Sequence, residues 1–238
     1  MLWAYIDETG LNPTAKRLTV GGLIGRKLDW QRLEPRWRRR LPRPLAPFHT
    51  QHCARGHKAY KGICEEERLR LYDDLAGLAS AYKFGIVSGS IDLDAWRKVP
   101  KPAHFTERFP TAYSLCFEIC LSTINSIGAN NKRRVAVSYA INEQFGERAE
   151  FIGQAYKSSQ HHAEWIMSCA PNTPANLIPL QVADMICYEI YHQKQSEGDP
   201  DGPPTRLMSR LVPEHIGHYY DETSLRELIA QRPSGLIS

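Results

Sequence analysis

LWAYIDETG, residues 2–10, is the stretch that decides the predicted fold. Its first half is rich in Trp, Tyr and Ile, the aromatic and β-branched types that suit a buried, pleated surface. It then ends on Asp7, Glu8, Thr9 and Gly10, two carboxylates followed by ordinary turn residues. A buried strand that delivers carboxylates at its end indicates either a metal or acid–base site, or simply a strand entering a turn. One short motif does not decide between the two.

Predicted strands and helices alternate along the rest of the chain. Strands are expected at 18–25, 84–91, 134–141 and 165–169, and helices at 30–40, 65–80, 113–124, 147–159 and 177–192. The first two strands are close enough to form an antiparallel hairpin, and the later crossovers predict parallel strands. This order predicts an α/β fold, a mixed sheet of about five strands flanked by helices. We expect 1–194 to form the domain, with 195–238 as a solvated loop and short helical tail packed on it.

Composition places the chain among ordinary globular proteins. Its 238 residues, 42% apolar and 24% charged, are enough to bury a sizeable core. No apolar run approaches the ~20 residues that a membrane span needs, and the N-terminus shows no secretory signal. Six cysteines without CxxC pairs predict reduced thiols and a cytoplasmic protein. Cys53 with His49, His52 and His57 offers zinc ligands, but no second close ligand pair accompanies them.

The net charge of +4 is spread unevenly. Eight Lys or Arg residues lie between Arg26 and Arg43, against two acidic residues. Trp30 and Trp37 are seven positions apart and therefore share one helical face. The segment either contacts nucleic-acid phosphates or forms a surface helix with buried tryptophans and solvated arginines.

A second group of polar residues lies on the predicted helix 177–192. Gln181, Asp184, Tyr188 and Tyr191 follow i, i+3, i+7 and i+10 spacing, opposite an apolar face. Asp184 stands between residues that are expected to be buried, and an unpaired buried charge is costly. It therefore needs a salt-bridge partner, a position at a wet rim, or a metal ion.

Metal-dependent phosphodiester cleavage gives a reason for such acids to converge. Two-metal sites need several carboxylates around ions roughly 3.5–4 Å apart. Asp7 and Glu143 at two strand ends, with Asp184 on the helix, offer that set to Mg²⁺ or Mn²⁺. Asn142 and Glu143 point to opposite faces of a strand, so only one of them can face the site.

Four motifs resemble the DUF 3800 family of RNase-H-like domains of unknown function. Residues 5–10 (YIDETG) resemble the family's opening YIDESG, and 18–24 its glycine-containing second strand. Residues 47–50 (PFHT) resemble its histidine motif, and 180–188 (LQVADMICY) its closing QxAD helix. The resemblance covers residues 1 to about 192. It implies an RNase-H-like fold and, by analogy with the wider superfamily, a metal-dependent nuclease.

The resemblance also implies roles for single residues. Asp7 carries over as the first-strand metal ligand and Asp184 as the helix carboxylate. Glu8, His49 and Gln181 are motif positions: His49 is suited to hold a water or phosphate, and Gln181 to orient Asp184 or contact the backbone. The resemblance implies an acidic residue at the end of the predicted strand 134–141, where this chain has Asn142 followed by Glu143. If Asn142 faces the metals, it supplies only a neutral ligand, and catalytic activity is in doubt.

The expected function is a Mg²⁺- or Mn²⁺-dependent phosphodiesterase acting on nucleic acid. Asp7, Glu143 and Asp184 would hold the metals, and the segment between Arg26 and Arg43 would contact the phosphate backbone. The alternative is a non-catalytic nucleic-acid-binding or interaction module that keeps the fold. Titration with Mg²⁺ or Mn²⁺ distinguishes the two hypotheses, because only the enzyme is expected to bind the metal. An actin-like nucleotide-binding domain is a third interpretation, but no second phosphate loop matches it.

Overall fold

A computed structural model describes residues 1–141, 144–158, 164–196 and 215–231 of the chain. Its centre is one mixed sheet with the strand order β5-β4-β1-β2-β3-β6. The strands are β1 (Leu2–Thr9), β2 (Arg17–Arg26), β3 (Gly85–Asp92), β4 (Val135–Ala140), β5 (Ile166–Asn172) and β6 (His215–Tyr220). The predicted α/β class with an N-terminal antiparallel hairpin is thereby confirmed.

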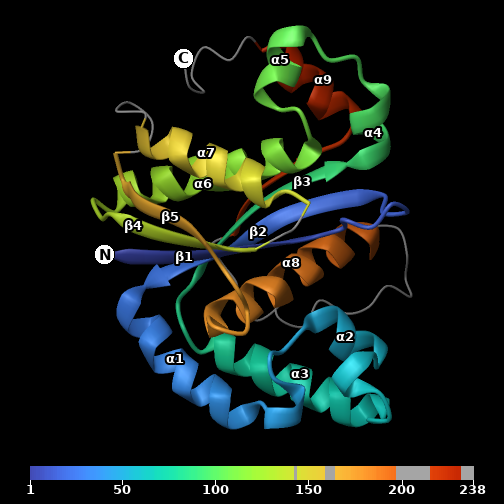
Figure 1. Cartoon of the computed structure of the whole chain (residues 1–238), viewed down its shortest axis with the longest axis vertical. Helices are drawn as coiled ribbons and strands as arrows, with labels where there is room; N and C mark the ends of the chain where they lie inside the picture. The colour runs from blue at the N-terminus through green and yellow to red at the C-terminus, as the bar shows by residue number, and fades with distance from the viewer. Residues whose placement is uncertain (142–143, 159–163, 197–214, 232–238) are drawn as a thin grey trace.

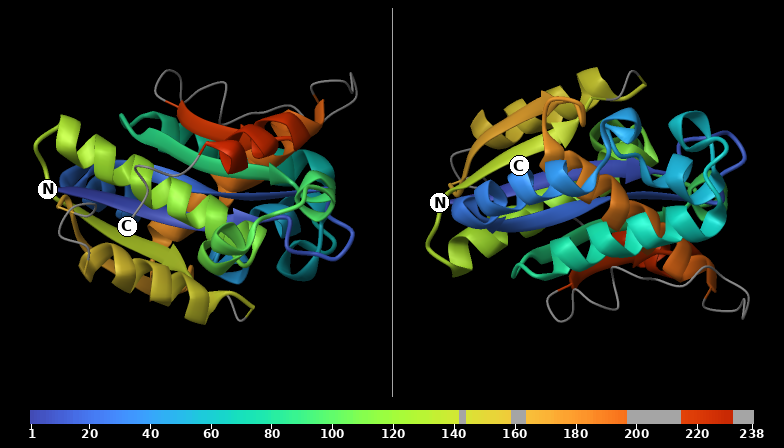
Figure 2. Two further views of the ribbon diagram at one scale, coloured as in Figure 1. Left: turned by 90° about the horizontal axis from the view of Figure 1, so that it is seen from above. Right: turned by 90° about the horizontal axis from the view of Figure 1, so that it is seen from below.

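Helices cover both faces of this sheet (Figure 1). One face carries α1 (Lys27–Arg40), α2 (Thr50–Arg55), α3 (Glu65–Ser80) and α8 (Ile178–Ser196). The other carries α4 (Leu93–Lys98), α5 (Ala103–Arg108), α6 (Ala112–Asn130), α7 (Gly146–Ser158) and α9 (Glu222–Ala230). Figure 2 shows the two faces in turn. A separate hydrophobic cluster fills the space under each layer, so the sheet is buried on both sides.

The first strand lies in the middle of the sheet and is buried on both faces. It pairs antiparallel with β2 and parallel with β4. Ala4 and Ile6 pack into the cluster under α6, whereas Tyr5 packs into the cluster under α8. Because side chains alternate along a strand, Asp7 belongs to the Tyr5 face, towards α8. The sequence of β1 thus determines which helix layer its first carboxylate meets.

The remaining strand directions agree with the prediction. Among the described strands only β2 is reversed: β3 pairs antiparallel with β2 and therefore runs in the same direction as β1, β4, β5 and β6. Between β2 and β3, α1 leads the chain away from the sheet and α3 leads it back (Figure 1). The chain therefore returns to the end of the sheet where β2 stops, and Gly85 at the start of β3 pairs with Ile24.

The tail after residue 194 adds a strand that was not predicted from the sequence. A helical tail and about five strands were expected, but His215–Tyr220 forms a sixth strand, β6, parallel to β3. Most of its residues are exposed, so the sequence shows no alternating apolar face there. The final helix α9 does form, with Asp221 as its N-cap and a capping box to Ser224.

The basic segment forms a surface helix. Trp30 and Trp37 are fully buried on the inner side of α1, and its arginines are exposed. None of the described helices combines the length and apolar character that crossing a membrane requires.

Candidate functional site

A cleft of about 530 Å³ opens at the end of the sheet where β1 stops. The strands β1 and β4 are parallel and end beside it, which is where open α/β sheets collect ligands. Its other walls are the loop before α2, the segment after β5, and one side of α8. The polar residues lining it are Asp7, Glu8, Thr9, Asn12, His49, Gln51, Arg55, Thr173, Asp184, Tyr188, Tyr191 and His192.

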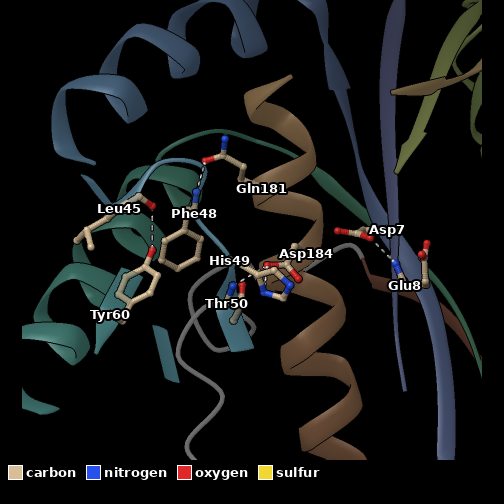
Figure 3. A network of polar contacts seen from close by, with 9 residues as sticks. All are labelled: Asp7, Glu8, Leu45, Phe48, His49, Thr50, Tyr60, Gln181 and Asp184. Carbon is tan, nitrogen blue, oxygen red and sulfur yellow. Dashed lines mark hydrogen bonds and ion pairs between the residues drawn. The ribbon is translucent and has the colours of Figure 1, made fainter. Parts of the chain in front are cut away.

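Asp7 is held at the end of β1 with its carboxylate turned towards α8 (Figure 3). Its side chain is buried, and Oδ1 accepts a hydrogen bond from the Glu8 amide at 2.8 Å. Its backbone carbonyl accepts from the Cys187 thiol at 3.1 Å, which ties β1 to α8. Burial, Glu8 and Asp184 raise the pKa of Asp7 well above its ordinary value.

Asp184 faces the same cleft from the second turn of α8. Its Oδ2 accepts the Thr50 amide at 2.6 Å, the first amide of α2. The same oxygen lies 3.7 Å from His49 Nδ1. Burial raises the pKa of Asp184, while His49 and the Thr50 amide partly oppose that rise. The predicted stripe on this helix is confirmed for Asp184, Tyr188 and Tyr191, which all line the cleft.

The two carboxylates lack a permanent positive charge beside them. Neither Asp7 nor Asp184 forms an ion pair with a Lys or Arg in the described part of the chain; His49 is the nearest basic group to Asp184. Two acids in one cleft that are partly removed from water and repel each other when ionised favour either protonation or a bound cation.

The other predicted carboxylates are placed differently. Glu8 borders the cleft but turns away from Asp184 across β1, as strand alternation requires (Figure 3). Glu143 and Asn142 lie outside the described residues, just after Ala140 and Ile141, which line the cleft. Within the described ranges, no group of three or more His, Cys, Asp or Glu side chains is arranged to hold a metal ion.

His49 stands at the mouth of the cleft. Its side chain is 46% exposed, and its ring lies 4.0 Å from that of His52, centroid to centroid. Burial, together with His49, Lys58 and His57, lowers the pKa of His52 to about 4. Cys53, which follows His52 in the sequence, is buried in the core, where burial raises its pKa to about 11. This placement suits a core thiol rather than a zinc ligand.

Gln181 lies one turn before Asp184 but does not line the cleft. Its Oε1 accepts Trp37 Nε1 at 2.9 Å and the Phe48 amide at 3.2 Å. Its Nε2 donates to the Pro174 carbonyl at 2.8 Å. Gln181 therefore fastens α1, the loop before α2 and the segment after β5 to α8. Through that loop it positions the groups that contact Asp184.

Two further cleft residues, Arg55 and His192, were not singled out from the sequence. Arg55, at the end of α2, brings an exposed guanidinium to the cleft. The ring of Tyr188 lies 4.3 Å from that of His192, and both line the wall formed by α8. The i, i+4 spacing of these two rings on one helix was a usable signal. No sequence pattern indicated Arg55, because the helix that brings it to the cleft has only six residues and is too short to show a period.

Comparison with known proteins adds no relative: no family model matches the chain, and a search of curated proteins finds no match. The chemistry of the cleft is therefore inferred from its own residues.

Proposed function

We propose that this chain is a Mg²⁺- or Mn²⁺-dependent phosphodiesterase that acts on nucleic acid. The observation that carries the proposal is the meeting of Asp7 and Asp184 in one cleft. Asp7 is buried, the Asp184 side chain is 15% exposed, and neither has a Lys or Arg partner among the described residues. The mixed sheet and its N-terminal hairpin also support the resemblance to the DUF 3800 family of RNase-H-like domains.

The residues present fit a hard divalent cation. Carboxylate oxygens are the ligands that Mg²⁺ and Mn²⁺ prefer, and a cation between them would offset the burial and the carboxylate repulsion that raise the pKa of Asp7. Asp7 and Asp184 would hold the ion. Glu143 is the proposed third ligand, because the chain that leads to it runs along the cleft at Ala140 and Ile141.

The remaining residues supply binding and positioning. A divalent ion bound there would activate a water and stabilise charge on a phosphoryl oxygen. His49, half exposed and 3.7 Å from Asp184, is placed to hold a water or a phosphate oxygen. Arg55 offers a guanidinium, the group that pairs best with phosphate. Tyr188 and His192 offer rings on which a base can stack.

The proposal includes a nucleic-acid partner and a compartment. The exposed arginines of α1 provide a surface for phosphate backbones, independent of base sequence. All six cysteines are free thiols, in keeping with the reducing cytoplasm.

Cleavage of labelled RNA and DNA oligonucleotides with Mn²⁺ tests this function. Asp184→Asn should abolish cleavage and still fold, since asparagine can accept the Thr50 amide as the carboxylate does. Asp74→Asn, on an exposed part of α3, is the matched control and should cleave like the wild type. Cleavage retained in Asp184→Asn would refute the proposal. Nucleic-acid binding without metal binding or cleavage would instead identify the non-catalytic module.

A further inference from the structure

A second cleft, of about 780 Å³, opens at the opposite end of β1. In Figure 1 this is the end of the sheet near the N-terminus, where α1 begins and β3 starts. Leu2 borders this cleft and Asp7 borders the first one. At ~3.3 Å per strand residue, the two clefts are about 17 Å apart along β1. They are therefore separate sites.

The second cleft has an apolar floor and one aromatic side. Its apolar lining comes from four elements of the fold: Leu2, Ile24, Ile127 and Ile216. The half-buried ring of Tyr82 forms a side and stacks on Phe84, with ring centroids 5.7 Å apart. The volume lies in the range of about 300–1,000 Å³ that is typical of small-ligand sites.

The rim of this cleft is cationic. Arg26, Arg32 and Lys83 line it with exposed side chains, and none of the three pairs with an acid in the described part of the chain. Asp29 is the acidic residue of the lining, so positive charge is in excess. A cleft whose charges are mostly of one sign concentrates their potential and therefore favours an anion.

Neighbouring elements strengthen this positive potential. The exposed residues 132–134 (KRR) follow α6, and the Arg134 carbonyl accepts the Leu2 amide at 2.9 Å, so this basic loop lies beside the cleft. The fourteen-residue helix α1 begins at the same rim, and no side chain caps its first amides. Both features add attraction for a negatively charged group at that position.

We propose that the second cleft binds a nucleotide, either free or as part of a polynucleotide. The phosphates would lie between Arg26, Arg32 and Lys83, and the base would lie on the apolar floor beside Tyr82. An inorganic anion would use the cations alone, whereas a nucleotide uses the apolar floor and the aromatic ring as well. This site needs no metal and does not depend on the function proposed for the carboxylate cleft.

Calorimetric titration with ATP in EDTA tests the site on the full chain. The variant Arg26→Gln/Arg32→Gln/Lys83→Gln should bind ATP about tenfold or more weakly than the wild type, because three phosphate-binding charges are lost. The variant Lys16→Gln/Lys61→Gln/Lys98→Gln loses the same charge from exposed positions outside both clefts and outside the basic segment Arg26 to Arg43, and should bind like the wild type. All six positions are exposed, so both variants should melt like the wild type.

Three outcomes would overturn the proposal. The first is that the wild type binds no ATP, and the second is that both triple variants lose the same amount of ATP affinity. The third is that Asp184→Asn loses ATP affinity while the Arg26→Gln/Arg32→Gln/Lys83→Gln variant keeps it. The last would place the nucleotide in the carboxylate cleft. A 12-nucleotide oligomer that displaces ATP would show that a polynucleotide can supply the nucleotide. An oligomer that does not displace ATP would show that the cleft takes the free nucleotide. Both of these support the site.

Discussion

Asp7 combines burial with two neighbouring acids, Glu8 and Asp184. Its raised pKa means that the folded protein holds this proton more tightly than the unfolded chain does. Between the unfolded pKa of about 3.9 and the raised value, the folded state therefore loses stability as the pH rises. A bound cation would remove this loss, so the same residue that destabilises the metal-free protein is the one suited to hold a metal.

Asp7→Asn should accordingly stabilise the metal-free protein. The amide keeps an oxygen for the Glu8 amide but carries no charge into the buried site. In EDTA at pH 7.5, urea unfolding should show a higher midpoint than the wild type, with a flatter pH dependence above pH 5. Asp74→Asn, at an exposed ion pair, should change little. A lowered midpoint in Asp7→Asn would contradict the electrostatic account of this residue.

Gln181→Ala should destabilise the fold and leave the metal-binding groups chemically unchanged. The substitution removes the hydrogen-bond partner of three groups: the Trp37 indole N–H, the Phe48 amide and the Pro174 carbonyl. We expect a loss of at least about 2 kcal/mol in the free energy of unfolding, since each unsatisfied buried group costs about 1–3 kcal/mol. Gln31→Ala, on the exposed side of α1, is the control and should cost well under half of that. Equal effects would refute the positioning role.

His52 should make the protein sensitive to mild acid. Its pKa is lowered to about 4 in the folded state, so the unfolded chain binds the extra proton between about pH 6.5 and 4. Stability should therefore fall as the pH falls through that window. His52→Gln should lose less stability than the wild type over the same range, measured by urea unfolding. The exposed His104→Gln should behave like the wild type; identical pH profiles for all three proteins would be the contrary result.

Among the elements of the fold, the β1–β2 hairpin matters most for the site, because its pairing fixes the position of Asp7. The two strands approach so closely at Gly22 that a Cβ there would lie 1.7 Å from the Tyr5 carbonyl oxygen. That contact involves backbone on both sides, so neither side can move away without breaking the ladder between the strands.

Gly22→Ala should therefore disrupt the central pairing. We expect a loss of about 3 kcal/mol in the free energy of unfolding, or failure to fold, because the added methyl overpacks a buried strand. Gly146→Ala at the start of α7 is the matched control, since nothing lies within 4 Å of its added Cβ. Thermal melts of both variants give the comparison. A Gly22→Ala protein as stable as the control would contradict the close approach.

The elements that the sequence predicted are those with long, regular patterns. β1 to β5 and the helices α1, α3, α6, α7 and α8 all form near their predicted positions. The helices α2, α4 and α5 have six residues each, too few to show a period. β6 was missed because an exposed edge strand needs no apolar alternation.

At the scale of the molecule, the site depends on contacts that no local pattern shows. Sequence motifs predicted that Asp7 and Asp184 converge, and the fold brings both to one cleft. That Gln181 fastens the loop of Phe48 and His49 to α8 follows only from tertiary packing. The result is a sheet with carboxylates in the cleft at one end and cations around the cleft at the other.

Calorimetric titration with Mn²⁺ alone tests the central claim most directly. The wild-type chain should bind Mn²⁺ with a Kd of about 1 mM or tighter, since the carboxylates of Asp7 and Asp184 line one cleft. Asp7→Asn and Asp184→Asn should each lose this binding while remaining folded, and Asp74→Asn should retain it. No binding by the wild type, or wild-type binding in both site variants, would contradict the proposed metal centre.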